Sequence, residues 1–232
     1  MRPAPGTELR ERDDPRPLVA VLVVAATWNV VGNLWLPSGW YVPANLAVAA
    51  VVILIGRGAG LTAAELGLAR RDLASGVKVG LLAAAVVAIG LLVAVVLPSL
   101  DSVLEDDVVA TDSAAMRWLR PLVRIPLGTV VFEELLFRSV LFGLILRRWG
   151  DVAAVVGTAA LFGLWHVVPA WETAEGSVAA AVAGTVAVTT VAGVLFGLLR
   201  RWSRSVVAPM LAHWATNSLA YLAALVSMGL IG

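Results

Sequence analysis

Residues 125–146 read Ile125-Pro-Leu-Gly-Thr-Val-Val-Phe-Glu133-Glu134-Leu-Leu-Phe-Arg138-Ser-Val-Leu-Phe-Gly-Leu-Ile-Leu146, an apolar run with three charged side chains inside it. A run of this length and composition predicts a membrane-spanning helix. A charged side chain at the centre of such a helix costs roughly 2.5 to 3.5 kcal/mol on insertion scales, so these residues are by default functional and paired. Glu133, Glu134 and Arg138 therefore mark the first candidate site.

The composition of the whole chain is that of an integral membrane protein. Of its 232 residues, 60% are hydrophobic and 14% are charged, and the mean hydropathy is +0.90. Apolar blocks recur along nearly the whole length, which predicts one all-α, polytopic transmembrane helical bundle of about seven spans. We expect these spans at residues 18–36, 43–56, 77–98, 122–146, 152–168, 178–199 and 205–228.

The charge and the cysteine content exclude several functions. The formal net charge is only +1, and no basic stretch is interleaved with aromatic residues, so nucleic acid is not an expected partner. The chain has no cysteine, which removes disulfides, zinc-thiolate sites and cysteine nucleophiles. The first apolar block lacks a small-x-small cleavage site near its end, so we expect a retained first span.

The distribution of Lys and Arg predicts the topology, because these residues accumulate in cytoplasmic loops. Four groups alternate along the expected spans: Arg2, Arg10, Arg12 and Arg16; Arg57, Arg70, Arg71 and Lys78; Arg147 and Arg148; and Arg200, Arg201 and Arg204. The pattern predicts a multi-pass protein of the cell (plasma) membrane with a cytoplasmic N-terminus. Arg117, Arg120 and Arg124 are exceptions, since they precede the fourth span on the side expected to be external.

Three regions follow from this pattern: a cytoplasmic tail at 1–17, N-terminal transmembrane helices and loops at 18–120, and a C-terminal region at 121–228 that contains the charged run. Within the loop after the second span, Thr62-Ala-Ala-Glu65 is a capping-box pattern that predicts a short helix to about Ser75 on the cytoplasmic surface. Six tryptophans fall at expected span ends, where amphipathic rings anchor in the membrane interface: Trp35, Trp40, Trp118, Trp149, Trp171 and Trp202.

Both histidines of the chain fall inside expected spans. A single membrane histidine is as readily a hydrogen-bonding group in helix packing as a functional residue. At a helical rise of about 1.5 Å per residue, however, Glu133, His166 and Asn217 all lie about 20 to 22 Å from the cytoplasmic ends of their spans. His213 lies one turn lower. Three helices thus present polar groups in one layer, which favours a shared site over scattered packing contacts.

Helical spacing separates the roles of these residues. Glu134 and Arg138 are four apart, so they share a helix face and can neutralise each other where no water is present. Glu133 is displaced by about 100° and is the carboxylate left over for chemistry. His213 and Asn217 also share one face at four-residue spacing, and offer a ring N–H and a side-chain amide side by side.

These groups fit the hydrolysis of a peptide bond by water. Glu133 near a neutral His166 could hold and deprotonate a water, and His213 and Asn217 could stabilise the resulting oxyanion. Serine catalysis fits poorly, because no Ser and His spacing suggests a nucleophile elbow. Zinc at Glu133, His166 and His213 is permitted, but the helical His-Glu-x-x-His signature is missing, so a metal is not implied.

Three motifs in the second half of the chain resemble those of the CPBP family of intramembrane proteases. The family includes the type II CAAX prenyl endopeptidases and bacterial bacteriocin-processing or immunity proteins. The motifs stand here as Glu133-Glu134-Leu-Leu-Phe-Arg138, Phe162-Gly-Leu-Trp-His166 and His213-Trp-Ala-Thr-Asn217. All three lie between about 121 and 228, on separate expected helices, and the resemblance implies that 121–228 is the catalytic core. No motif position departs from the family pattern.

The resemblance implies a glutamate-dependent endopeptidase without a metal or other cofactor. It implies that Glu133 and His166 activate the catalytic water and that His213 and Asn217 form the oxyanion hole. Glu134 and Arg138 belong to the same motif, and we expect them to orient the site, with a purely structural ion pair as the alternative. The implied partners are membrane lipid and a peptide or protein substrate, with or without a lipid anchor.

Two other functions remain open at this point. A non-catalytic membrane scaffold or bacteriocin-immunity protein could keep the polar cluster only for helix association. A proton-coupled transporter also uses intramembrane Glu, His and Arg, but the chain shows no inverted repeats or paired broken helices. The sequence decides neither the substrate nor the oligomeric state.

Overall fold

The computed structural model describes residues 14–97, 99, 104, 107–174 and 176–231. This part of the chain is all-helical and contains no strand, which confirms the expected all-α class. Of the expected cytoplasmic tail, residues 1–13 lie outside the described residues, together with Arg2, Arg10 and Arg12.

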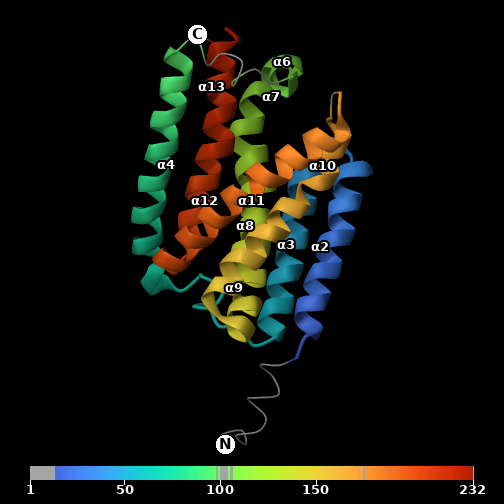
Figure 1. The fold of residues 1–232 in the computed structure, drawn as a ribbon, viewed down its shortest axis with the longest axis vertical. Coiled ribbons are helices and arrows are strands. Elements are labelled where there is room, and N and C mark those ends of the chain that lie inside the picture. Colours follow the sequence, from blue (N-terminus) through green and yellow to red (C-terminus); the bar gives the residue numbers. More distant parts are fainter. Residues whose placement is uncertain (1–13, 98, 100–103, 105–106, 175, 232) are drawn as a thin grey trace, which may run out of the picture.

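An antiparallel helix pair, α2 and α3, forms one side of the bundle, and α4 lies on the other side (Figure 1). The second span is longer than the expected 43–56, because the 3-10 helix η1 runs directly into α3. Together they cover 21 residues, enough for a bilayer core of about 30 Å. The N-terminal elements are α2 (Arg16–Leu34), η1 (Ser38–Trp40), α3 (Tyr41–Gly58), η2 (Arg70–Asp72) and α4 (Leu73–Val96).

The connection between α3 and α4 differs from the prediction. The capping box forms, since the Thr62 amide donates to Glu65 Oε2 over 2.8 Å, but it closes only a single turn. Gly67 follows with a left-handed backbone at φ 71°, which favours glycine and ends the turn. Leu66 is fully buried, so the segment packs into the protein. The expected surface helix as far as Ser75 is therefore wrong.

A long helix runs through the centre of the molecule and carries the first motif. It continues from α7 to Trp149, where Gly150 reverses the chain with φ 83° and ψ −178°, values that glycine tolerates. The second half of α9 therefore runs back antiparallel to the first. The elements of this region are α6 (Asp107–Thr111), α7 (Ala114–Leu119), the π-helical η4 (Arg120–Val130), α8 (Val131–Glu134), the π-helical η5 (Leu135–Leu141) and α9 (Phe142–Trp165).

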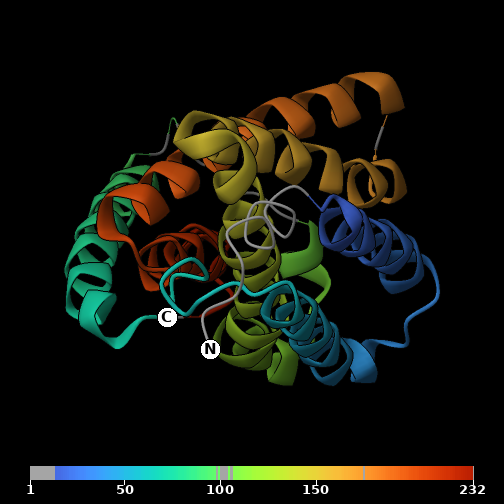
Figure 2. The same ribbon diagram turned by 90° about the horizontal axis from the view of Figure 1, so that it is seen from below.

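Among the C-terminal helices, α12 and α13 lie beside α4, whereas α11 crosses along α9 and α10 reaches α2 (Figure 2). Helix α11 packs along α9 so closely that a Cβ added to Gly193 would lie 2.9 Å from Ala159 Cα. Such small residues allow helix backbones to approach in a membrane bundle. These elements are α10 (Val167–Glu172), α11 (Val178–Ser203), α12 (Val207–Trp214), the π-helical η6 (Ala215–Leu219) and α13 (Ala220–Ser227).

Five of the described helices are long and apolar enough to cross a membrane. One of them, Ala114–Glu172, has 59 residues and reverses at Gly150, so it contains two of the expected spans. The last expected span, 205–228, corresponds to the continuous run of α12, η6 and α13, each of which is shorter than a span. The count of seven therefore stays a prediction.

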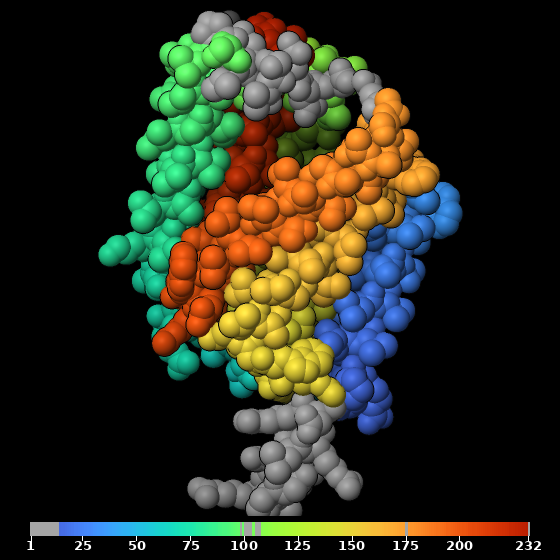
Figure 3. All heavy atoms as spheres, in the orientation of Figure 1, coloured from blue at the N-terminus to red at the C-terminus, as the bar shows by residue number. Residues whose placement is uncertain are grey.

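The outer surface is suited to contact with lipid. Large apolar side chains on α4 face outward, among them Leu82 at 68% and Val86 at 64% exposure. The six tryptophans expected at span ends are all exposed there. Many apolar helices and this apolar surface together indicate a multi-pass membrane protein. The space-filling view in Figure 3 also shows a hollow between α11 and the α12–α13 column.

Candidate active site

Glu133 and Glu134 lie on the four-residue segment α8, between the π-helical stretches η4 and η5. A π-turn widens the helix locally and is frequently found at functional sites. Glu133 is 6% exposed, and Glu134 and Arg138 are completely buried. The three charges of the first motif therefore lie in the protein interior and not toward lipid.

The predicted pair of Glu134 and Arg138 forms, with Arg138 Nη1 3.3 Å from Glu134 Oε1. Arg138 Nη2 also donates to the backbone oxygen of Gly193 over 3.3 Å, and its guanidinium lies 4.2 Å from the ring centre of Phe162. His213 Nδ1 lies 2.8 Å from the same Glu134 oxygen. Glu134 thus connects the first motif to α12, a contact that helical spacing alone did not predict.

Glu133 makes a different set of contacts. Its Oε1 accepts a hydrogen bond from Trp165 Nε1 over 3.1 Å. Its Oε2 lies 3.8 Å from His213 Nε2, too far for a hydrogen bond, and has no other partner although it is buried. No ion pair joins Glu133 to Arg138, in agreement with the spacing argument. One carboxylate oxygen is therefore available for chemistry.

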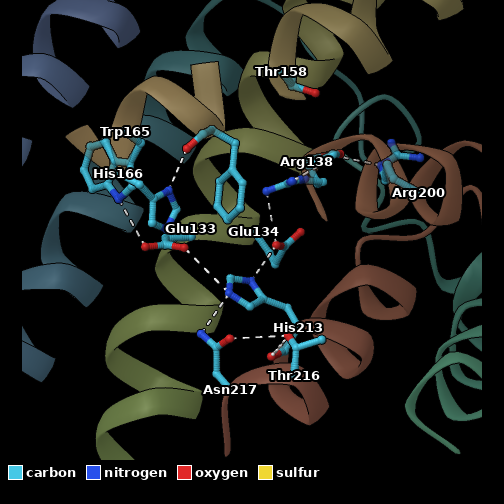
Figure 4. A network of polar contacts seen from close by, with 12 residues as sticks. Glu133, Glu134, Arg138, Thr158, Trp165, His166, Arg200, His213, Thr216 and Asn217 are labelled. Atoms are coloured by element: carbon cyan, nitrogen blue, oxygen red, sulfur yellow. Dashed lines mark hydrogen bonds and ion pairs between the residues drawn. The ribbon is translucent and has the colours of Figure 1, made fainter. Parts of the chain in front are cut away.

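His213 connects both glutamates with Asn217 (Figure 4). Its Nε2 lies 3.1 Å from Asn217 Nδ2, while Nδ1 faces Glu134. A proton on Nδ1 donates to the Glu134 carboxylate, which leaves Nε2 to accept from the Asn217 amide. The predicted proximity of His213 and Asn217 is confirmed, but here the two groups bind each other.

His166 occupies the break between α9 and α10, with φ −86° and ψ 0°. Its Nδ1 lies 2.7 Å from Phe162 O, so a proton on Nδ1 donates to this carbonyl and Nε2 is left as an acceptor. Figure 4 shows the ring beside the Glu133 carboxylate, and both residues line one cavity. The conformation of the helix break thus aims the second motif at the first.

A cavity of about 220 Å³ lies in front of Glu133 and His166. Since one water occupies about 30 Å³ in the liquid, this volume accommodates several waters or a short stretch of peptide. Its deep end is buried, and its outer end is exposed at Asn33. The remaining lining residues are Trp28, Gly32, Tyr41, Asn45, Phe132, Trp165 and Pro169.

The wall opposite the motifs comes from α2 and α3, and sequence reasoning missed it. Trp28 Nε1 donates to Asn45 Oδ1 over 2.6 Å, so Asn45 keeps its amide N–H groups for other partners. Asn29 Nδ2 donates to Trp165 O over 2.9 Å and ties α2 to the end of α9. The signal was present, because Asn29 and Asn45 are polar residues inside apolar spans, like the histidines.

Arg200 is a second missed residue. It was expected in a cytoplasmic loop after a span that ends at 199, but α11 continues to Ser203 and Arg200 is buried. Its Nε donates to Arg138 O over 3.0 Å, and its Nη2 donates to Glu65 O over 2.8 Å. Arg200 thus fixes the backbone of η5 to the turn at residues 62–67.

The geometry does not assemble a metal site from the described residues. No group of three or more His, Asp or Glu side chains among them is arranged to hold a metal ion. His213 uses both ring nitrogens in contacts with protein side chains. Catalysis without a metal stays a prediction.

The fold and its surface define a polytopic, all-helical membrane protein. Residues 115–219 match the model of a family described as Type II CAAX prenyl endopeptidase Rce1-like. This segment contains all three motifs, and the match confirms the resemblance to the CPBP family. Comparisons with curated proteins and with solved structures gave no match.

Proposed function

We propose that this chain is an intramembrane endopeptidase that hydrolyses a peptide bond of a membrane-associated protein or peptide by a water that Glu133 and His166 activate. The proposal is carried by the Glu133 carboxylate, which lines the cavity and keeps Oε2 without a partner. A carboxylate beside a cavity that can hold water is suited to act as a general base. The family match of residues 115–219 supports hydrolysis over a scaffolding role.

In this mechanism, Glu133 takes a proton from a water in the cavity while the water oxygen attacks the carbonyl carbon of the substrate. His166 holds the same water through Nε2, because its Nδ1 is engaged by Phe162 O. The attack gives a tetrahedral intermediate with its negative charge on the former carbonyl oxygen. When the C–N bond breaks, the proton passes from Glu133 to the leaving amine. The carboxylate is regenerated, and the products are an acid and an amine.

His213 and Asn217 are proposed to stabilise the oxyanion. They lie next to the attacking group, since His213 Nε2 is 3.8 Å from Glu133 Oε2. Asn217 Nδ2 is now directed at His213 Nε2, so its amide must exchange this contact for the substrate oxygen, and His213 donates to the oxyanion only once a proton also occupies its Nε2. A donor that meets the negative oxygen only after the water has attacked stabilises the transition state more than the bound substrate.

Glu134 and Arg138 support this arrangement without touching the reacting atoms. Glu134 fixes the Nδ1 face of His213, and Arg138 neutralises Glu134. Arg138 in turn donates to the backbone oxygen of Gly193, and its own backbone oxygen accepts a hydrogen bond from Arg200. These contacts connect the polar cluster to α11 and α12. They hold the two buried carboxylates in fixed positions.

The proposed location is the cell (plasma) membrane, with a cytoplasmic N-terminus. The grouping of Lys and Arg at one end of the helices supports this orientation. The proposed substrate is a peptide or protein in the membrane, with or without a lipid anchor. The name of the matched family points to prenylated substrates among the candidates.

A cleavage assay with detergent-purified protein tests the function. We expect the wild type to cleave a fluorogenic peptide library, and Glu133→Gln and His213→Ala to be folded but inactive. A chelator should leave cleavage unchanged. Cleavage by Glu133→Gln would contradict the role of Glu133, and loss of activity with chelator that zinc restores would contradict the metal-free mechanism.

A further inference from the structure

The cavity in front of Glu133 reaches the surface of the described part of the chain at Asn33. Its inner end is lined by Glu133 and Asn45, which are buried. Its outer end is lined by Asn33, which is exposed on the last turn of α2. Tyr41, the first residue of α3, lines the same cavity. The opening therefore lies where α2 and α3 are joined.

The opposite direction is closed by packed side chains. Between Glu133 and Arg147 the helix carries a continuous series of buried residues: Leu136, Phe137, Arg138, Ser139, Val140, Leu141 and Phe142. Arg200 and the turn at residues 62–67 cover this side further, through hydrogen bonds to Arg138 O and Glu65 O. Neither a substrate nor water reaches Glu133 from this end without displacing the core.

The basic residues gather at the closed end. There α2 begins, α3 ends, α4 begins, α9 reverses and α11 ends (Figure 1). The positive side chains at this end are Arg16, Arg57, Arg70, Arg71, Lys78, Arg147, Arg148, Arg201 and Arg204. By the positive-inside rule this end faces the cytoplasm.

The three arginines that break this rule each have a local partner at the open end. Arg120 forms an ion pair with Asp112, with Nη2 2.7 Å from Oδ1. Arg124 lies 4.2 Å from the ring centre of Tyr41, and Arg117 donates to a backbone oxygen. They are therefore structural contacts of this end, and the excess of positive charge stays at the closed end.

Resting on the function proposed above, we infer that the active site opens to the non-cytoplasmic face and that its substrates are peptide segments presented from that side. Glu133 lies about 21 Å from Arg147 along the helix, so in a bilayer core of about 30 Å it is about 9 Å from the opposite interface. The exposed rings of Trp35 and Trp40 flank the opening, where interfacial tryptophans are expected.

The side to which the active site opens determines which peptide segments can reach Glu133. A segment that has been translocated, or one that is anchored in the outer half of the membrane, reaches Glu133 over the short distance. A lipidated C-terminus held at the cytoplasmic surface lies at the closed end and would have to cross the buried side chains of η5. The substrate class is therefore exported or outward-facing peptide.

Labelling of single cysteines tests the direction independently of activity, since the chain has no native cysteine. Gly39 in η1 and Gly58 at the end of α3 form a matched pair, because a Cβ added at either position meets nothing within 4 Å. A membrane-impermeant maleimide should label Gly39→Cys in intact cells and Gly58→Cys only after permeabilisation. The reverse pattern, or equal labelling of both, would overturn the inference.

Membrane vesicles of known orientation test the substrate side. Right-side-out vesicles should cleave a fluorogenic peptide library added outside, and inverted vesicles should not, with Glu133→Gln as the background. Cleavage by inverted vesicles alone overturns the inference but leaves the protease function intact. If detergent-solubilised wild type also fails to cleave, the protease function itself is wrong, while the cysteine labelling still decides the direction of the cavity.

Discussion

The two walls of the cavity come from parts of the chain with different relations to known proteins. One wall carries Glu133 and His166 and lies within residues 115–219, which match the prenyl endopeptidase family. The other carries Asn45 and Tyr41 and belongs to α2 and α3, outside the matched segment. The first wall holds a carboxylate and an imidazole, which are suited to activate water, whereas the second offers an amide and a phenol, which we expect to bind and orient the substrate.

This division separates chemistry from recognition. The matched wall is backed by a network of charges, in which Glu134, Arg138 and His213 hold one another. The α2–α3 wall contains no such network among the described residues: Trp28 donates a neutral hydrogen bond to Asn45, and Arg124 lies over the Tyr41 ring. We therefore expect changes in the matched wall to affect the chemical step and changes in the other wall to affect substrate binding.

The largest effect is expected from removing the charge of Glu133. Glu133→Gln keeps the shape but removes the general base, so kcat should fall by about 100- to 10,000-fold with little change in thermal stability. Steady-state kinetics on a cleaved peptide measure it. The matched control is Glu172→Gln, the same change at an exposed position, which should keep wild-type rates. A Glu133→Gln enzyme with more than a tenth of wild-type activity would remove the distinction between the walls.

The ion pair of Glu134 and Arg138 behind the matched wall should contribute to the stability of the folded protein. Arg138→Met leaves Glu134 buried beside His213 without its cation, which costs roughly 3 to 5 kcal/mol for a broken buried pair. Unfolding in detergent should therefore occur at much milder conditions. The double variant Glu134→Gln/Arg138→Met should recover part of the loss, because no uncompensated charge remains. Equal destabilisation of the single and double variants would show that the ion pair is not the cause.

The opposite wall should give a smaller and different effect. Asn45→Ala removes one hydrogen-bonding group, a change of roughly 0.5 to 1.5 kcal/mol, so KM should rise about two- to tenfold with kcat nearly unchanged. Trp28→Phe, which removes the donor to Asn45 Oδ1, should shift KM in the same direction. If either variant lowers kcat as strongly as Glu133→Gln does, the α2–α3 wall takes part in the chemistry.

Sequence reasoning located the matched wall because charges in apolar helices are rare and costly. The pairing of Glu134 with Arg138 and the proximity of His213 to Asn217 followed from helical spacing. The contact of His213 with Glu134 could not follow, since it depends on how α12 packs against α8. The π-helical stretches on both sides of α8 were not predicted either, because they arise from packing and leave no periodic pattern in the sequence.

The opposite wall was harder to predict for a physical reason. Asn45 and Trp28 are neutral, so placing them in a membrane helix costs far less than a charge and marks them less strongly. The connection at residues 62–67 was misjudged because its capping box is satisfied in one turn, and Gly67 then diverts the chain. Arg200 was assigned to a loop because arginine is rarely buried, yet three backbone oxygens accept its hydrogen bonds.

The smallest effect is expected outside both walls, at the turn of residues 62–67, at the end of the bundle opposite the cavity opening. Burial raises the pKa of Glu65, but hydrogen bonds from Arg147 and Thr62 outweigh it and lower the pKa from 4.5 to about 2. The ionised form therefore stabilises the folded protein fully above about pH 4.5, and this contribution is lost as the pH falls toward 2. Because the pair is partly exposed to solvent, it is worth about 1 kcal/mol or less. Thermal unfolding of wild type and Glu65→Gln should differ slightly at pH 6 and converge near pH 2, whereas a difference that grows on acidification would contradict this assignment.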